Sequence, residues 1–287
     1  MRSFFGLLNI LSFCFGLLAC EENQSHTDLT DLSLQSLDAL VYPDQSLFDL
    51  DLLDQEQQLT QSQDQDVNQN QDRNFPLPPP HYPLFALPIF ADDITLIDQR
   101  IIFGVDHDPS TGQRIRCEDY MGRIFPYCYD GHLGSDFILL GGFETMDQGS
   151  ARVQSALAGV VIDIADGNYD RCHADITTAD VNCDGYPMRA NYVSIQHDNG
   201  WKTDYYHLKR GSVAVNVGER VNCGTLLGLI GSSGYSSAPH LHFEVSDPYG
   251  TIWDPFAGPS SQEFSLWNHQ PSSGSSDSLP STSCSSP

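Results

Sequence analysis

The sequence predicts an all-β domain of antiparallel sheets with a groove that holds a metal ion. Short stretches of strand character follow one another between residues 156 and 230, and none of the chain shows a long amphipathic helical pattern. Within residues 239–244, two histidines stand two positions apart in an apolar run. Because positions i and i+2 of an extended strand point to the same face, both imidazoles are expected on one side of a strand.

Four stretches justify the sheet. Residues 156–164 are mostly apolar and predict a buried strand, whereas residues 192–197 alternate with period two. Asp198, Asn199 and Gly200 supply turn residues, so residues 201–207 are expected to return as an antiparallel partner. Residues 213–218 and 225–230 are expected to continue the sheet.

The start of the chain predicts export. Residues 1–19 combine a basic start with an apolar run that is too short for a comfortable membrane span, as in a signal peptide. The sequence Leu17-Leu18-Ala19-Cys20 resembles a bacterial lipobox, which implies cleavage before Cys20 and acylation of its thiol. The alternative is an ordinary signal peptide with a chance cysteine. Glu21 after Cys20 favours an outer-membrane lipoprotein that faces the periplasm.

The remaining flanks differ in composition from the strand-rich region. Residues 20–80 are rich in acidic residues, Gln and Asn, and predict a disordered tether, although a leucine series leaves a short helix or docking peptide as an alternative. Residues 81–130 are predicted as a lead-in whose apolar stretches could cover a sheet face. The domain proper is expected over 131–259, and the Ser- and Pro-rich residues 260–287 predict a flexible tail.

Net charge limits the class of partner. The formal charge is -25 and the isoelectric point is about 4.3. Phosphates of nucleic acid and anionic lipid headgroups would be repelled, so neither is an expected electrostatic partner.

Several histidines and one carboxylate carry the chemistry. His132, Asp136 and one histidine of the pair His240 and His242 make three protein ligands. Three ligands with one open position are typical of a catalytic zinc site. His207 and the other member of the pair would remain free to move a proton and to stabilise an oxyanion. Any one of these histidines alone fits a satisfied polar residue better, but the ordered set favours a metal site.

The ordered motifs resemble the lysostaphin-like, LytM-type zinc metallopeptidases over roughly residues 128–256. The shared features are H-x-x-x-D at His132, Y-x-H-L at Tyr205, a glycine-rich turn at residues 228–234 and P-H-L-H-F-E at Pro239. Two departures are Ala238, where the family usually has Gly, and a long insert between the strands that contain Val160 and Tyr192. Neither departure removes a candidate ligand.

The resemblance implies specific roles and an activity. It implies zinc ligation by His132, Asp136 and His242, catalysis by His207 and His240, and hydrolysis of peptide bonds in peptidoglycan by a monomeric enzyme. The alternative is a non-catalytic LytM-type factor that binds cell wall or activates amidases; relatives of that kind have lost zinc ligands. A third reading is a secreted hydrolase aimed at other bacteria or at proteins.

The cysteines and one acidic loop complete the predictions. Cysteines beyond the export signal fit disulfides, and the closest in sequence are Cys117 with Cys128 and Cys172 with Cys183. Cys223 and Cys284 could pair or stay free. Asp180, Asn182 and Asp184 match the first half of a calcium loop, but Asn191 stands where the last ligand should be Glu. A disulfide-stapled polar loop at a groove wall is the favoured reading over calcium.

Overall fold

The computed structural model describes residues 82–112, 115–175, 180–271 and 279–284. The predicted signal peptide, Cys20 and the tether therefore lie outside the described residues. Within the described part of the chain, no helix is both long and apolar enough to cross a membrane.

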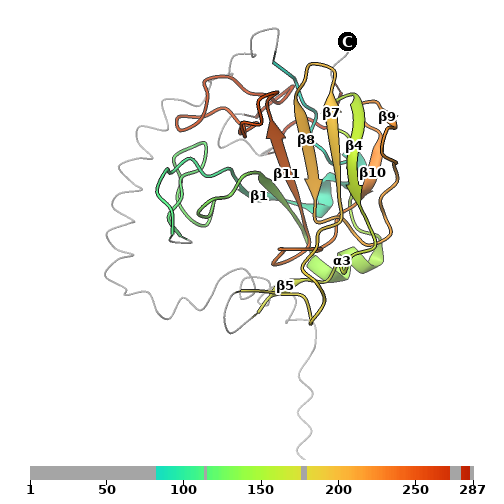
Figure 1. The fold of residues 1–287 in the computed structure, drawn as a ribbon. Helices are drawn as coiled ribbons and strands as arrows, with labels where there is room; N and C mark the ends of the chain where they lie inside the picture. The colour runs from blue at the N-terminus through green and yellow to red at the C-terminus, as the bar shows by residue number, and fades with distance from the viewer. Residues whose placement is uncertain (1–81, 113–114, 176–179, 272–278, 285–287) are drawn as a thin grey trace, which may run out of the picture.

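A seven-stranded antiparallel sheet forms the centre of the molecule, with the strand order β1-β2-β11-β8-β7-β4-β9 (Figure 1). Its strands are β1 (Ile97–Phe103), β2 (Ser135–Leu139), β4 (Gly159–Ala165), β7 (Tyr192–His197), β8 (Lys202–Tyr206), β9 (Arg220–Val221) and β11 (His240–Ser246). The predicted all-β class is confirmed.

Two small sheets and two short helices accompany the main sheet. The small sheets pair β3 with β10 and β5 with β6. The bounds are β3 (Arg152–Gln154), β10 (Leu226–Leu229), β5 (His173–Ala174), β6 (Val181–Asn182), a 3-10 helix η2 (Ala91–Leu96) and α3 (Gly142–Gln148). In Figure 1, α3 and β5 lie at the lower end of the main sheet.

The period-two alternation of β11 separates core from site. Leu241, Phe243 and Val245 are fully buried, and Phe243 stacks on Trp267 with ring centroids 5.7 Å apart. His240 and His242 alternate with these residues and therefore point to the opposite face. This alternation places the apolar core behind the sheet and the two imidazoles in front of it.

The predicted strands are confirmed at one hairpin and wrong at two later segments. β7 begins and ends at the expected residues and pairs with β8 across the Asp198–Gly200 turn. Residues 213–218 form no strand, because a turn in which Glu219 donates its backbone N–H to the Asn216 carbonyl interrupts them. Residues 226–229 form β10, which joins β3 instead of continuing the main sheet.

The lead-in from Tyr82 and the described part of the C-terminal segment belong to the folded domain. The lead-in supplies β1, which pairs with β2, and its Phe85 is fully buried. The described parts of residues 260–287 differ from the expected flexible tail, since Leu266 and Trp267 lie in the core. The prediction followed from the Ser- and Pro-rich composition and gave no weight to these two residues. Their large apolar side chains cover the back of the sheet, and their removal from water stabilises the fold.

Candidate metal centre and active site

Three ligand-type atoms converge on the front face of the main sheet. Nε2 of His132 lies 3.2 Å from Oδ1 of Asp136 and 3.1 Å from Nδ1 of His242. Nδ1 of His242 lies 2.8 Å from the same carboxylate oxygen. Among the residues that the structure describes, these three are the group of His, Cys, Asp or Glu side chains able to hold a metal ion, and all three are buried.

The outer nitrogen of each ligand imidazole has a partner of its own. Nδ1–H of His132 donates to the Gly104 carbonyl at 2.7 Å, and Nε2–H of His242 donates to the Glu244 carboxylate at 2.9 Å. With those protons committed, the inner nitrogens carry lone pairs that face each other and Asp136. Such partners fix the tautomer and the ring direction of histidines that bind metals.

The charges of the site favour a cation at its centre. Burial opposes protonation of His242, but hydrogen bonds to Asp136 and Glu244 and the charges of both carboxylates raise its pKa to about 9. Burial also opposes ionisation of Asp136, yet the neighbouring His132 and His240 hold the pKa of this carboxyl well below its usual range. The carboxylates thus favour positive charge at this buried point, and a metal ion bound there would take the place of the second His242 proton.

The donor set and its dimensions fit zinc. A tetrahedral zinc ion with bonds of about 2.0–2.1 Å separates two of its ligand atoms by about 3.3 Å. The three observed separations, 2.8, 3.1 and 3.2 Å, are close to that edge length. Two imidazoles and one carboxylate leave a fourth position for water or substrate, which is the arrangement of a catalytic site.

The strand order brings these residues together across the sequence. β11 lies between β2 and β8, and the register places His242 opposite both Asp136 and Tyr206. His132 reaches the site from the loop before β2, where the chain passes closely under β11. A Cβ on Gly134 would lie 2.7 Å from Nε2 of His242, so this close approach requires glycine.

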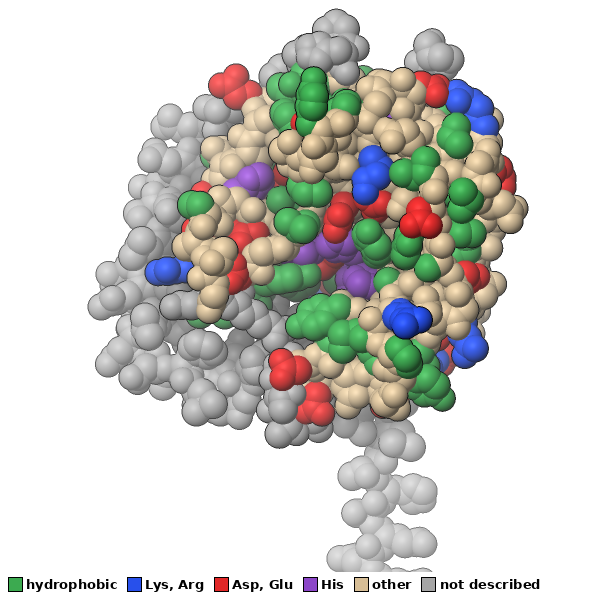
Figure 2. Space-filling model, in the orientation of Figure 1, with side chains coloured by type: hydrophobic (Ala, Val, Ile, Leu, Met, Phe, Trp, Pro, Cys, Tyr) green, Lys and Arg blue, Asp and Glu red, His purple; other side chains and the backbone are tan. Residues whose placement is uncertain are grey.

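The two remaining histidines lie beside the metal ligands. His240 Nδ1–H donates to the Ala238 carbonyl at 2.7 Å, and its Nε2 lies 3.5 Å from Asp136 Oδ1. His207 Nδ1–H donates to the Ser233 carbonyl at 2.7 Å, and its ring centroid is 4.6 Å from that of His240. Figure 2 shows histidine side chains gathered in a hollow at the middle of this face, with hydrophobic side chains around them.

Both of these histidines are held neutral. Burial lowers the pKa of His207 well below its ordinary value, and the neighbouring imidazoles of His240 and His242 disfavour a further positive charge there. Burial also lowers the pKa of His240, against the opposing charge of Asp136. A neutral imidazole with its Nδ1–H already donated presents the Nε2 lone pair, which is the form that accepts a proton.

Three residues near the site escaped the sequence reasoning. Glu244 was visible only as the last residue of the PHLHFE run, Gly134 as a spacer inside HxxxD, and Ser236 as a serine after the glycine-rich turn. The Oγ atom of Ser236 lies 3.3 Å from Nδ1 of His240. Their roles depend on contacts between segments, which local spacing does not report.

The calcium prediction is not supported. The Asn182 side chain accepts a hydrogen bond from the backbone of Asp184 at 2.8 Å, and the Asp184 carboxylate accepts one from the Tyr169 hydroxyl. These oxygens serve the loop itself, which therefore needs no cation. Among the described residues, no group of acidic ligand atoms converges at this loop.

Disulfides close three loops in the described part of the chain. Cys117 pairs with Cys128 and Cys172 pairs with Cys183, as the spacing suggested. Cys223 pairs with Cys284, which ties the C-terminal segment to the domain and decides an alternative that the sequence had left open.

Comparison with known proteins identifies the domain. The sequence pattern of peptidase family M23 matches residues 142–255, which include His207, His240 and His242. The chain carries a peptidase family M23 domain. His132 and Asp136 precede the matched range, so the structure rather than the family match brings them to the M23 histidines.

Relatives of the M23 domain include named endopeptidases. The chain is 42% identical over 60 residues to the peptidoglycan DD-endopeptidase ShyA of Vibrio cholerae, a stretch that covers 21% of this chain and 14% of ShyA. It is 44% identical over 50 residues to the glycyl-glycine endopeptidase ALE-1 of Staphylococcus capitis, which covers 17% and 13%. The similarity thus spans about a seventh of the length of these curated relatives.

A solved structure similar to the M23 domain is the catalytic domain of lysostaphin from Staphylococcus simulans. The two are 27% identical, with a TM-score of 0.30, over 44% of this chain and 77% of the lysostaphin domain.

Proposed function

We propose that this protein is a zinc-dependent endopeptidase that hydrolyses peptide bonds in peptidoglycan. The observation that carries the proposal is the convergence of His132, Asp136 and His242 on one point, with two neutral imidazoles beside it. A metal held by three ligands next to uncommitted proton acceptors is the arrangement that metal-assisted hydrolysis requires.

The residues divide into a metal-holding set and a proton-moving set. When bound, zinc supplies Lewis-acid polarisation of a carbonyl and lowers the pKa of water to about 7. His240 and His207 present Nε2 toward the open side of the site. One of these nitrogens would take a proton from the attacking water. That imidazole, now protonated, would stabilise negative charge on the carbonyl oxygen and return the proton to the leaving amine, while the other nitrogen would accept the second proton of the water as the product carboxylate forms.

Peptidoglycan peptides are proposed as the substrate on the strength of the relatives. ShyA is named for a peptidoglycan DD-bond and ALE-1 for a glycyl-glycine bond. Both names denote the hydrolysis of peptide bonds, and the name of ShyA places its bond in peptidoglycan, so peptidoglycan peptides are the proposed substrate class. We propose the class and leave the choice of bond to the cleavage assay below.

A non-catalytic factor is the second candidate. Relatives of that kind act by binding the cell wall or an amidase and have no need of a metal. The complete ligand set of this chain, with an acceptor for the outer nitrogen of each ligand imidazole, favours the catalytic reading.

We also propose a place for the protein in the cell. The export signal and the lipobox-like Leu17–Cys20 support a lipid anchor on Cys20, and Glu21 supports the outer membrane with the domain in the periplasm. Each buried methylene of an acyl chain contributes ~0.8 kcal/mol, so a multiply acylated cysteine is a stable anchor. The acidic tether would give the domain reach toward the wall.

Cleavage of isolated peptidoglycan tests the function. The mature protein in detergent, loaded with zinc, is incubated with purified sacculi, and the released fragments are identified by mass spectrometry. We expect new peptide ends, loss of the activity after chelation and its return with zinc. Intact cross-links together with stimulation of a cell-wall amidase would instead establish the non-catalytic factor.

A further inference from the structure

The insert between β4 and β7 lies beside the loop that contacts both proposed catalytic histidines. We call residues 231–239, between β10 and β11, the histidine loop. Cys172 donates its backbone N–H to the Ser232 carbonyl at 2.9 Å, and Ala174 donates to the Ser237 carbonyl at 2.8 Å. In the opposite direction, Ser232 donates to the Asp170 carbonyl at 3.2 Å. The insert therefore runs along the histidine loop as a partner segment.

A row of hydroxyl groups connects His240 to the insert. Nδ1 of His240 lies 3.3 Å from Oγ of Ser236, which lies 2.8 Å from Oγ of Ser232. Ser232 in turn donates to the Cys172 carbonyl at 2.6 Å. The Ser236 hydroxyl also donates to the Ala238 carbonyl at 2.9 Å, the carbonyl that accepts Nδ1–H of His240 at 2.7 Å. The imidazole, the Ala238 carbonyl, Ser236 and Ser232 thus form one hydrogen-bonded chain that ends on Cys172. Such chains strengthen their members in a buried setting, and both serines are buried here.

The same loop holds His207 through Ser233. The Ser233 carbonyl accepts Nδ1–H of His207 at 2.7 Å. Its hydroxyl donates to the Leu208 carbonyl at 3.0 Å and accepts the backbone N–H of Asn191 at 2.8 Å. Asn191 follows the insert directly, so both proposed catalytic imidazoles are oriented by atoms that the insert holds in place.

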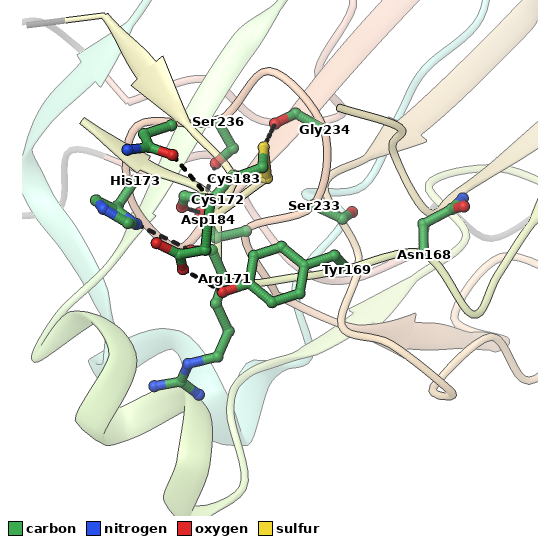
Figure 3. The surroundings of a disulfide bond; sticks show 12 residues. Asn168, Tyr169, Arg171, Cys172, His173, Cys183, Asp184, Ser233, Gly234 and Ser236 are labelled. Atoms are coloured by element: carbon green, nitrogen blue, oxygen red, sulfur yellow. Dashed lines mark hydrogen bonds between the residues drawn. A yellow bond between two sulfur atoms is a disulfide. The ribbon is translucent and has the colours of Figure 1, made fainter. Parts of the chain in front are cut away.

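The Cys172–Cys183 disulfide closes the insert at this contact (Figure 3). Sγ of Cys183 lies 3.5 Å from the Gly234 carbonyl oxygen, which is a further contact between the insert and the histidine loop. A Cβ on Gly234 would lie 2.8 Å from the backbone nitrogen of Ala190, so the loop and the insert meet without spare room. Besides the disulfide, the two-residue strands β5 and β6 and the contacts of Tyr169 with Asp184 and Tyr186 join the two arms of the insert.

We propose that the Cys172–Cys183 disulfide and Ser236 position His240 for catalysis. The disulfide holds the Cys172 carbonyl at the end of the hydroxyl chain, and Ser236 transmits that constraint to Nδ1 of His240. The imidazole then keeps its Nδ1–H tautomer and directs Nε2 to the reacting groups. Ser236 and the disulfide are positioning groups, since neither reaches the substrate. The inference rests on the proposed function, because it concerns a histidine that we assign to proton transfer.

Two variants break the chain at different points, and a third is the matched control. Ser236→Ala removes the middle hydroxyl, and Cys172→Ala/Cys183→Ala opens the disulfide. Cys117→Ala/Cys128→Ala opens a disulfide with the same sequence separation of 11 residues, so the chain-entropy effect on stability should be similar. We expect kcat to fall about tenfold in the first two, with KM within about twofold and zinc content unchanged, because a small misorientation of a catalytic group is costly. Ser236→Thr, which keeps the hydroxyl, should restore kcat.

Nitrogen NMR of the histidine side chains reads the tautomer without any assay of activity. In the zinc-loaded wild type and the Cys117→Ala/Cys128→Ala control, we expect the Nδ1–H form of His240. In Ser236→Ala and Cys172→Ala/Cys183→Ala, we expect the Nε2–H form to appear. An unchanged tautomer in both variants, or an equal fall of kcat in the control, would overturn the positioning role. If the wild-type protein cuts nothing while the two variants still show the expected tautomer change, the proposed activity is rejected and the positioning role is kept.

Discussion

Glu244 accepts a hydrogen bond from Nε2–H of His242 at 2.9 Å, although the two residues lie on the same strand and are separated only by Phe243. The period of the strand makes this contact, because positions i and i+2 project from the same face. The contact leaves Nδ1 of His242 as the nitrogen that faces His132 and Asp136. Glu244 is thus a partner of the candidate ligand and lies outside the group of three.

Replacement of Glu244 should weaken metal binding while leaving all three ligands. Loss of an outer partner typically lowers metal affinity about 10–100-fold. We expect Glu244→Gln near the lower end and Glu244→Ala near the upper end, measured by zinc titration at pH 9, where competition from protons is small. The control is Glu263→Gln, which removes the same charge at an exposed position. Equal affinities in all three variants would show that Glu244 does not support the metal.

Ligand and catalytic histidines should separate in a paired measurement of zinc content and turnover. His242→Ala and Asp136→Ala leave two ligands each, so zinc should be lost on dialysis. His240→Ala and His207→Ala keep three ligands, so zinc should remain while hydrolysis falls by ~10²-fold or more. His240 and His242 share one strand face, so each variant of that pair controls for damage to the strand. Equal zinc loss in all four variants would contradict the division of roles.

Gly134 should be intolerant of a methyl group. A Cβ there would meet Nε2 of His242 and the Phe243 carbonyl oxygen, each at 2.7 Å. Gly134→Ala should displace His242, lower zinc affinity at least about tenfold and cost about 1–3 kcal/mol in the free energy of unfolding. Leu133→Ala is the neighbouring control, because Leu133 is 50% exposed. If Gly134→Ala binds zinc as tightly as the wild type, the loop before β2 shifts to accommodate the methyl group without displacing His242.

His197 should make the protein less stable in mild acid. It is buried on β7, donates Nδ1–H to the Ala158 carbonyl at 3.0 Å, and burial lowers its pKa from 6.5 to about 4. Between these pH values the unfolded chain binds more protons than the folded one, so the free energy of unfolding falls as pH drops from about 6.5 to about 4. At 1.36 kcal/mol per pKa unit, the loss approaches about 3 kcal/mol.

Urea unfolding at a series of pH values measures this slope. In His197→Gln the side chain no longer titrates, so the stability curve between pH 6.5 and 4 should be flatter than in the wild type by about that amount. Parallel curves would show that His197 does not titrate with the assigned shift.

A variant of Cys20 should show whether acylation of this residue anchors the protein to the membrane. Cys20→Ser removes the thiol that acylation needs, so we expect an unprocessed precursor that no longer partitions into detergent. Mass spectrometry and Triton X-114 partitioning of the two proteins give the measurement. Mature protein of wild-type mass in the detergent phase of the variant would contradict the lipobox interpretation.

The sequence alone determined the local features of this protein. The alternation in residues 239–244 sufficed to place His240 and His242 on one face, because strand geometry fixes side-chain direction at every second residue. The turn residues at 198–200 similarly predicted the β7–β8 hairpin, which joins neighbours in the chain. Short cysteine spacings pointed to Cys117–Cys128 and Cys172–Cys183 for the same reason.

Only the tertiary structure decided what depends on distant segments. It placed β11 between β2 and β8, and so brought Asp136 opposite His242. It also chose which nitrogen of each imidazole faces the site, because that choice follows from the Gly104 and Ala238 carbonyls and from Glu244. Strand order and carbonyl directions arise from pairing between residues far apart in the chain, and no local period encodes them. The burial of Trp267 behind the sheet followed from the same long-range packing, against the expectation from its Ser- and Pro-rich surroundings.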